Sequence, residues 1–497
     1  MTDDNSDNKS LILAAEDCPP DYFEQLHFFS TQEKRIISKL IAHGPVLLKG
    51  ARGSGKSALM IEASRQMYPR QENSPAFGIY ISLRHLELLR SEGEKYERML
   101  CQLIIDAVNK AMDEGKLDIA FEAQPNITSL QKELSNLSSS TGKRIVVFFD
   151  DAAHIGREAP LHEFFDIFRT LSSSTISCKA AIYPGVTKFG TRFDVYNDAT
   201  VIDVSKNDEV KEYNSSFAEI IRKRFSDRLP EEAFSSQFSL ENVAGFMGRA
   251  VLGNMRGFLF ACNKLGEENI DSRIGLTSIT NTLIALASNY YWPLIEELKP
   301  KLGIYAPMID PAITIAEDIF EEAGSQNKRN VIILREITQR LSKPLEILEY
   351  TGFISIKDVS RAMKSRGRGT RYSLNLCTLL ENIPGTRVTS DIYNMWLHEK
   401  DDSLELHKGS SLYKFDLPKL LESGEMLILS EDLGKLGKSN AYPYGLTPFQ
   451  IDILKKAGYE TVSDLAEAND EALLTLDNIG PQILKRIRST VAQAIWM

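Results

Sequence analysis

The chain has 497 residues, of which 43% are hydrophobic and 25% are charged. This length and composition are typical of a folded protein of roughly three domains, and they exclude collagen-like, mucin-like and wholly disordered proteins. The net charge of −10 excludes an overall positive field, so binding to nucleic acid would need a local basic patch.

The cysteines and the N-terminus indicate a reducing, intracellular environment. The cysteines are scattered, with no CxxC pair and no histidine at metal-ligand spacing, which argues against disulfides and a zinc site. They are Cys18, Cys101, Cys178, Cys262 and Cys377. The first residues are acidic where a signal peptide is basic, and no run approaches the ~18 apolar residues that cross a bilayer. We expect a protein of the prokaryotic cytoplasm or nucleoid that has no membrane contact.

Residues 45–204 alternate short apolar runs with longer helical stretches, which is typical of an α/β domain with a mainly parallel sheet. Five runs have the apolar density of strands that are buried on both faces. They cover residues 45–49, 78–82, 145–149, 179–183 and 200–204. From 207 to 266 the apolar spacing becomes helical and predicts a smaller helical subdomain behind the sheet.

A glycine-rich segment follows the first strand directly and precedes a helical run. It matches the pattern GxxxxGK[ST] and consists of Gly50, Ala51, Arg52, Gly53, Ser54, Gly55, Lys56 and Ser57. Such a segment wraps backbone N–H groups around a phosphate at the N-terminus of a helix. Lys56 would reach the β- and γ-phosphates, and the Ser57 hydroxyl would bind Mg²⁺. The segment therefore predicts ATP and Mg²⁺ as cofactors.

Two carboxylates, Asp150 and Asp151, end the strand at 145–149. Asp150 is placed to support the Mg²⁺ ion. Asp151 stands where many hydrolysing ATPases have a glutamate that polarises the attacking water. Because its side chain is one methylene shorter, we expect slow hydrolysis that depends on an oligomer or on DNA.

The two motifs, the extra strand between them and the helical subdomain resemble the origin-recognition-complex-like branch of the AAA+ ATPases, with kinship to the STAND switch ATPases. The resemblance covers about residues 22–376. It implies that Thr187 senses the γ-phosphate and that Arg256, in a Gly-Asn-x-Arg segment of the lid, contacts the nucleotide. It also implies that Arg192 completes the site of a neighbouring subunit, so that the protein self-associates. The alternative for both arginines is an ordinary surface position.

A basic segment lies between two short β runs at 353–356 and 372–374, after two helices, and this order resembles a winged helix. Residues 357–371 carry six positive charges and one negative charge, and we expect the two β runs to flank them as a loop. A charge run is often only a solvated face. The fold context favours contact with double-stranded DNA. The candidate residues are Lys364, Arg366, Arg368 and Arg371.

The C-terminal segment resembles a helix-hairpin-helix module and is similar to the C-terminal domain of the bacterial RNA polymerase α subunit. A hairpin around Asn478 and Gly480 would present backbone N–H groups to a DNA phosphate, with Lys485 and Arg486 beside it. Residues 445–497 nevertheless carry five positive and seven negative charges. A protein-docking module of the same shape is the alternative.

Together these patterns predict an α/β fold class with a P-loop ASCE/AAA+ domain and a helical lid, followed by winged-helix and all-α helix-hairpin-helix domains. The expected boundaries are a disordered leader at 1–20, the P-loop ATPase core at 21–205, the lid at 206–268, connecting helices and winged helix at 269–376, an uncertain region and linker at 377–443, and the helix-hairpin-helix module at 444–497.

The predicted function is an ATP-binding and ATP-hydrolysing switch that binds double-stranded DNA and controls an assembly or an unidentified effector protein. Anti-phage defence, transposition and replication are the processes in which such an architecture would act. The alternatives are a nucleotide-bound, non-hydrolysing adaptor whose C-terminal module docks protein, and a polymerase-linked transcription regulator.

Overall fold

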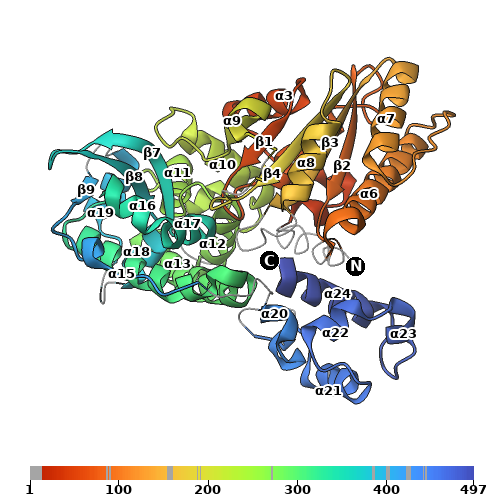
Figure 1. Cartoon of the computed structure of the whole chain (residues 1–497). Helices are drawn as coiled ribbons and strands as arrows, with labels where there is room; N and C mark the ends of the chain where they lie inside the picture. The colour runs from red at the N-terminus through yellow and green to blue at the C-terminus, as the bar shows by residue number, and fades with distance from the viewer. Residues whose placement is uncertain are drawn as a thin grey trace.

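The computed structural model describes most of the chain from residue 14 to residue 496 (Figure 1). The residues that it does not describe inside this range are 86–87, 89–90, 154–160, 187–188, 191, 270–272, 383–384, 386, 399–402, 421–426, 440–441 and 443–444. The expected leader, residue Thr187 and the end of the expected linker therefore lie wholly or partly outside the described residues. No described helix is long and apolar enough to cross a membrane.

A five-stranded sheet forms the N-terminal part of the molecule. Its strands are β1 (Val46–Lys49), β2 (Ala76–Ser82), β3 (Arg144–Ala153), β4 (Ile176–Ile182) and β5 (Thr200–Asp203). Every pairing is parallel, and the order is β2-β3-β4-β1-β5. Strand β4 thus lies between β1 and β3, and β2, the extra strand between the two motifs in the chain, pairs with β3 at the edge of the sheet. The predicted fold class is confirmed.

Helices cover both faces of this sheet because its side chains alternate between two apolar cores. Val146 and Phe148 of β3 face α3 (Thr31–Ile41) and α4 (Lys56–Arg65). Val147 and Phe149 face the other layer. That layer consists of α6 (Gly93–Glu114), α7 (Ile127–Thr141) and α8 (Leu161–Leu171). The glycine-rich segment and Asp150 lie at the carboxyl ends of β1 and β3.

The lid and the connecting helices follow β5 and lie beside the sheet domain (Figure 1). The lid consists of α10 (Tyr213–Arg224), α11 (Leu240–Ala250) and α12 (Met255–Glu268). The connecting elements are α13 (Leu276–Leu286), a π-helical stretch (Ala287–Tyr291), α14 (Trp292–Leu298) and α15 (Ile309–Ser325). One apolar core runs through all of them.

A second sheet packs on the same core. Its order is β7-β8-β6-β9, with β6 (Asn330–Leu334), β7 (Ile354–Ala362), β8 (Arg368–Leu374) and β9 (Ser403–Leu406). Two helices, α16 (Arg335–Arg340) and α17 (Ser342–Thr351), lie between β6 and β7 in the chain. The order helix α15, strand β6, helices α16 and α17, then strands β7 and β8 is the order of a winged helix. The winged helix itself stays a prediction.

The expectation that residues 357–371 form a loop is wrong. Ladder pairing of β7 with β8 extends to Ala362 and Arg368, so only the tip at 363–367 is a turn. Positive φ angles at Arg366 (72°) and Gly367 (93°) make this turn. Alternating polar and β-branched residues such as Val359 support a two-stranded ribbon, which charge alone did not reveal.

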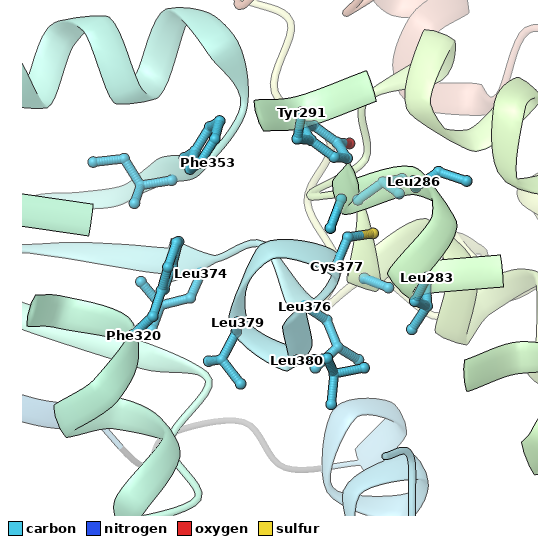
Figure 2. Close-up of a cluster of buried hydrophobic side chains, with 14 of the residues drawn as sticks. Leu283, Leu286, Tyr291, Phe320, Phe353, Leu374, Leu376, Cys377, Leu379 and Leu380 are labelled. Carbon is cyan, nitrogen blue, oxygen red and sulfur yellow. The ribbon is translucent and has the colours of Figure 1, made fainter. Parts of the chain in front are cut away.

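The first part of the uncertain region at 377–443 packs with the lid, the connecting helices and the second sheet, which together share one apolar core. We call these elements the second unit. Residues 376–406 supply α18 (Leu376–Asn382), α19 (Ser390–His398) and β9, which pairs in parallel with β6. Figure 2 shows side chains of α18, including Cys377 and Leu380, packed among Tyr291, Phe320 and Phe353. These residues therefore belong to the main core of the second unit and not to a linker.

The C-terminal unit begins before residue 444. It contains α20 (Leu427–Ser430), a 3₁₀ turn (Leu433–Leu436), α21 (Pro448–Lys456), α22 (Val462–Glu467), α23 (Asp470–Leu474) and α24 (Pro481–Trp496). Leu433, Leu436 and Tyr442 are buried in its core. The expectation of a linker at the end of the 377–443 region is therefore wrong for these residues, because glycine and polar positions here alternate with apolar anchors.

Candidate functional site: a closed P-loop

The glycine-rich segment joins β1 to α4 as the sequence predicted. Gly53 and Gly55 adopt left-handed backbone angles, with φ of 79° and 92°. A Cβ on Gly53 would also lie 2.7 Å from Asn254 Oδ1, so a larger residue cannot fit. Lys56 Nζ donates hydrogen bonds to the carbonyl oxygens of Gly50 (2.8 Å) and Ala51 (3.1 Å). The lysine thus closes the loop on itself.

The cleft above this loop is small. It is lined by the loop, by Phe28 and Phe29, and by lid residues that include Ile220, Arg256 and Leu259. Its volume is about 100 Å³. Small-molecule sites usually have at least about 300 Å³, so the loop and lid must move apart before a nucleotide can enter.

Asp150 lies at the carboxyl end of β3 beside the loop. It accepts a hydrogen bond of 2.6 Å from Tyr80 Oη, and its carboxylate is also hydrogen-bonded to the Ser57 side chain. Burial, followed by the nearby Asp151 charge, raises the pKa of Asp150 to about 7. Burial likewise lowers the pKa of Lys56 to about 7. Ser57 and Asp150 are the pair that could hold Mg²⁺, because both offer oxygen atoms at one point.

The Asp151 carboxylate is not positioned to polarise an attacking water, which is the role predicted from the sequence. Its carboxylate accepts hydrogen bonds from Arg84 Nε (2.6 Å) and Tyr183 Oη (2.8 Å). Its φ of 54° and an irregularity in the β3 ladder after Phe149 turn the side chain toward these donors. In this conformation the carboxylate is paired and does not present a free oxygen to a water molecule.

Arg84, Tyr80, Tyr183 and Glu16 were missed by sequence reasoning. Arg84 lies 3.2 Å from Glu16 and 2.6 Å from Asp151, and the two carboxylates raise its pKa although burial opposes them. Carboxylate oxygens of Glu16, Asp150 and Asp151 lie within 4.8 Å of one another. Arg84 and Tyr183 directly follow β2 and β4, which flank β3. Ligands bind at the carboxyl ends of parallel strands. Polar residues that follow neighbouring strands were therefore the pattern in the sequence that could have identified Arg84 and Tyr183 as site residues.

The Gly-Asn-x-Arg segment of the lid lies on the P-loop. Asn254 caps α12 through Gly257 N (3.0 Å) and donates through Nδ2 to Arg52 O (2.6 Å). The backbone N–H of Arg256 donates to Gly53 O (3.1 Å), and Arg256 lines the cleft. The structure therefore brings Arg256 together with Lys56 and the loop. Contact of its side chain with a nucleotide stays a prediction.

One other residue of the expected site is not brought to the cleft, and another lies outside the described residues. Arg192 is exposed, its carbonyl oxygen accepts a hydrogen bond from Arg169, and it is not among the residues that line the cleft. Its role toward a neighbouring subunit stays a prediction. Thr187 lies outside the described residues.

Helix α17, the second of the two helices that precede the basic segment, contacts the P-loop and the residues after β4. The backbone N–H of Arg52 donates to Tyr350 O (3.1 Å), and the Tyr350 ring lies 5.2 Å from that of Tyr183. Lys343 Nζ reaches Gly185 O at 3.1 Å. Seven of the ten residues of α17 are buried. In this conformation α17 cannot enter a DNA groove.

The candidate DNA residues of the second sheet divide into two groups. Arg371 is only 7% exposed and pairs with Asp358 at 2.7 Å, so the prediction that it contacts DNA is wrong for this conformation. Its position in β8 points it inward, which a count of charges could not show. Lys364 and Arg366 are exposed at the turn, and the Arg368 guanidinium bonds to Ser360.

The candidate DNA residues of the C-terminal unit are exposed. Asn478 has a φ of 66° in the turn between α23 and α24, and Gly480 follows it. Lys485 and Arg486 are exposed on the first turns of α24. Arg488, by contrast, is paired with Asp470 at 2.6 Å. The geometry is compatible with a helix-hairpin-helix, which stays a prediction.

No protein-family model and no curated protein sequence matches the chain. Similar solved structures include a Walker-type ATPase of Pyrococcus abyssi, at 16% identity and a TM-score of 0.41, with 71% of this chain and 95% of that chain covered. The Orc1 protein of Aeropyrum pernix in complex with DNA is 14% identical, with a TM-score of 0.33 and coverage of 75% and 95%. A STAND protein of Pyrococcus horikoshii is 13% identical, with a TM-score of 0.28 and coverage of 71% and 42%. The names of the second and third proteins are those of the ATPase groups that the sequence resembles, but at such identities and TM-scores the similarity assigns no function to this chain.

Proposed function

We propose that the protein is an ATP-dependent switch in which nucleotide binding at residues 50–57 releases α17 from the P-loop domain. The observation that carries this proposal is that one loop contacts both the lid and α17, which share one apolar core. The Arg52 carbonyl accepts from Asn254 of the lid, while its N–H donates to Tyr350 of α17. A nucleotide that reshapes the loop must disturb both hydrogen bonds.

The closed lysine supplies the trigger. To reach the β- and γ-phosphates, Lys56 has to leave the carbonyl oxygens of Gly50 and Ala51. Its ammonium group also lies 3.6 Å from the centre of the Tyr183 ring, which packs against Tyr350. If Lys56 moves, Tyr183 loses a cation–π contact. Tyr183 is also the residue whose ring packs against Tyr350 and so holds α17 on the P-loop domain.

Hydrolysis in this proposal is slow, because Asp151 must first be freed. Arg84 and Tyr183 occupy its carboxylate, and the oxygens are needed to orient a water in line with the γ-phosphate. Mg²⁺ held by Ser57 and Asp150 would neutralise phosphate charge. A switch requires only that the bound states differ, so slow turnover is compatible with it.

Hydrogen–deuterium exchange tests the release of α17. A saturating non-hydrolysable ATP analogue with Mg²⁺ is expected to raise amide exchange at the C-terminal end of α17, residues 349–351, by about tenfold, because release removes the contacts of Tyr350 with the P-loop domain. Leu345, Ile347 and Leu348 stay in the core of their own unit. Exchange in α7, on the far face of the sheet, serves as the internal control. Lys56→Ala protein should show no change. Unchanged exchange in α17 at proven saturation with the analogue would refute the switch.

We propose further that the C-terminal unit binds double-stranded DNA through its hairpin. The supporting observation is that Asn478, Lys485 and Arg486 are exposed together at one end of α24. Backbone N–H groups and the helix N-terminus there suit a phosphate. Helix α17 is buried in this conformation. Of the predicted DNA-binding residues, those of this hairpin and of the turn at 363–367 are therefore the ones that DNA can reach.

Fluorescence anisotropy with a labelled duplex tests this second proposal. The double variant Lys485→Glu/Arg486→Glu is expected to bind at least about tenfold more weakly and to lower the salt slope by about 2, since two phosphate contacts are lost. The charge-matched control is Arg98→Glu/Lys110→Glu on the exposed face of α6. Equal binding by both variants would favour the alternative in which this unit docks protein.

A further inference from the structure

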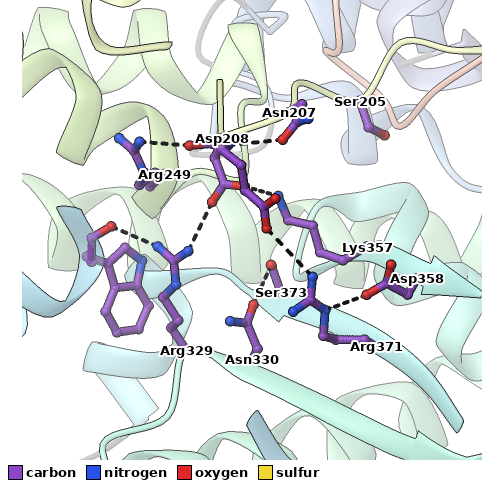
Figure 3. A network of polar contacts seen from close by, with 12 residues as sticks. Ser205, Asn207, Asp208, Arg249, Arg329, Asn330, Lys357, Asp358, Arg371 and Ser373 are labelled. Carbon is purple, nitrogen blue, oxygen red and sulfur yellow. Dashed lines mark hydrogen bonds and ion pairs between the residues drawn. The ribbon is translucent and has the colours of Figure 1, made fainter. Parts of the chain in front are cut away.

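A second cavity lies between the lid and the second sheet, away from the P-loop. Its walls are the segment that follows β5, helix α11, and strands β6 to β8 with their flanking residues (Figure 3). Its volume is about 340 Å³, three times that of the closed nucleotide cleft and within the range of small-molecule sites.

Five cationic residues line this cavity. Lys206 pairs at 2.6 Å with Glu33, which does not line it, and the other four come from three parts of the chain. Arg249 comes from α11, Arg329 directly precedes β6, and Lys357 and Arg371 come from β7 and β8. Arg329 and Arg371 are 11% and 7% exposed. Guanidinium groups are rarely buried without a fixed anionic partner, so this convergence calls for an anion.

One internal carboxylate meets part of that need. Asp208 Oδ2 lies 3.2 Å from Arg329 Nη2, and its Oδ1 pairs with Lys357. Its backbone oxygen accepts from Arg249 Nη2 at 2.9 Å. Burial acts to raise the pKa of Asp208, but Lys357 and Arg329 lower it overall, so the carboxylate is firmly ionised. Figure 3 shows these groups turned toward Asp208.

The remaining acids leave the cavity positive. Besides Asp208, its acidic residues are Asp358 and Glu209, which are 39% and 50% exposed and therefore screened by water. Arg329 Nε is buried with no hydrogen-bond acceptor among the described residues. Burial, together with the Arg329 charge, lowers the pKa of Arg249. Both observations indicate positive charge that Asp208 does not fully balance.

We propose that this cavity binds a small phosphate-bearing ligand on Arg249, Arg329, Lys357 and Arg371, in competition with the internal carboxylate of Asp208. Planar guanidinium groups on several sides suit phosphate oxygens, because each can donate two parallel hydrogen bonds. The hydroxyl group of Ser355 adds a neutral donor, whereas that of Ser373 donates to Asn330 Oδ1 at 2.7 Å. The burial of the arginines selects a small molecule over the backbone of a duplex.

Isothermal titration calorimetry with inorganic pyrophosphate tests the proposal, in a Lys56→Ala background that removes binding at the P-loop. Arg329→Gln is expected to weaken pyrophosphate binding by about tenfold, the contribution of a charge-assisted hydrogen bond. Asp208→Asn should instead tighten it by at least about threefold, because a competing negative charge is gone. Loss of fold cannot produce tighter binding, so the second variant separates binding from stability.

Two surface variants serve as controls, because each makes the same charge change as one of the test variants. Arg98→Gln and Asp227→Asn alter exposed residues outside this cavity and should leave binding unchanged. Absence of pyrophosphate binding in the Lys56→Ala background would overturn the proposal, as would equal binding by Asp208→Asn and its control. Because the P-loop is disabled throughout, the result does not depend on the ATP switch.

Discussion

Lys56→Ala is expected to lower the affinity for ATP by at least about 100-fold, equivalent to about 3 kcal/mol. Lys56 is the first residue of α4 and holds the lysine position of the phosphate-binding pattern, and it is 4% exposed in the closed loop. In the bound state its ammonium would pair with phosphate oxygens where little water screens them. Titration with a fluorescent ATP analogue in the presence of Mg²⁺ measures the loss.

Lys39→Ala is the control for this substitution. Lys39 is exposed on α3 of the same domain, so its removal changes the net charge without touching the loop. Its affinity should stay within about twofold of the unmodified protein, since single exposed charges contribute little. Equal, tight binding by both variants would contradict the assignment of residues 50–57 as the phosphate site.

Phe353→Ala is expected to lower the free energy of unfolding of the second unit by about 3–5 kcal/mol. Phe353 is fully buried between α17 and β7. Its ring lies 4.8 Å from Trp292, 6.1 Å from Tyr291 and 6.3 Å from Phe320, in the cluster of Figure 2. The substitution removes the ring and leaves a cavity that aromatic neighbours cannot fill.

Hydrogen exchange measured at increasing urea concentrations shows which parts of the chain lose stability in the Phe353→Ala variant. One core joins the lid, the connecting helices, the second sheet and α18, whereas the five-stranded sheet has two cores of its own. We therefore expect α12 and β6 to lose protection together, while β3 keeps most of its protection. Val359→Ala, at a position 76% exposed, should cost little. Uniform loss in β3 as well would show that the two units unfold as one.

The P-loop domain was predictable from the sequence because its signals are local. An apolar strand, glycines at set positions and a lysine before a helix define the loop whatever the rest of the chain does. The five strands were found within a few residues of their ends, because strands buried on both faces are apolar throughout. The lid arginine was also found, since its four-residue segment carries its own helix cap in Asn254.

The second and third units were harder to predict for a physical reason. Residues 357–371 look like a basic loop by charge, yet most of them pair as strands, and Arg371 turns inward to Asp358. Residues 377–406 contain ordinary amphipathic helices and one short strand whose partner, β6, is some 70 residues away in the chain. Strand pairing over such a separation leaves no local signature.

The sequence by itself determined the nucleotide loop, the five-stranded sheet and the position of the carboxylates after β3. Only the tertiary structure decided what those groups can do. It places Arg84 and Tyr183 on Asp151 and seats Tyr350 on the loop. It also gathers Arg249, Arg329 and Lys357 around Asp208. Local patterns specify chain conformation, whereas the pairing and burial of charged groups depend on segments that meet only when the chain has folded.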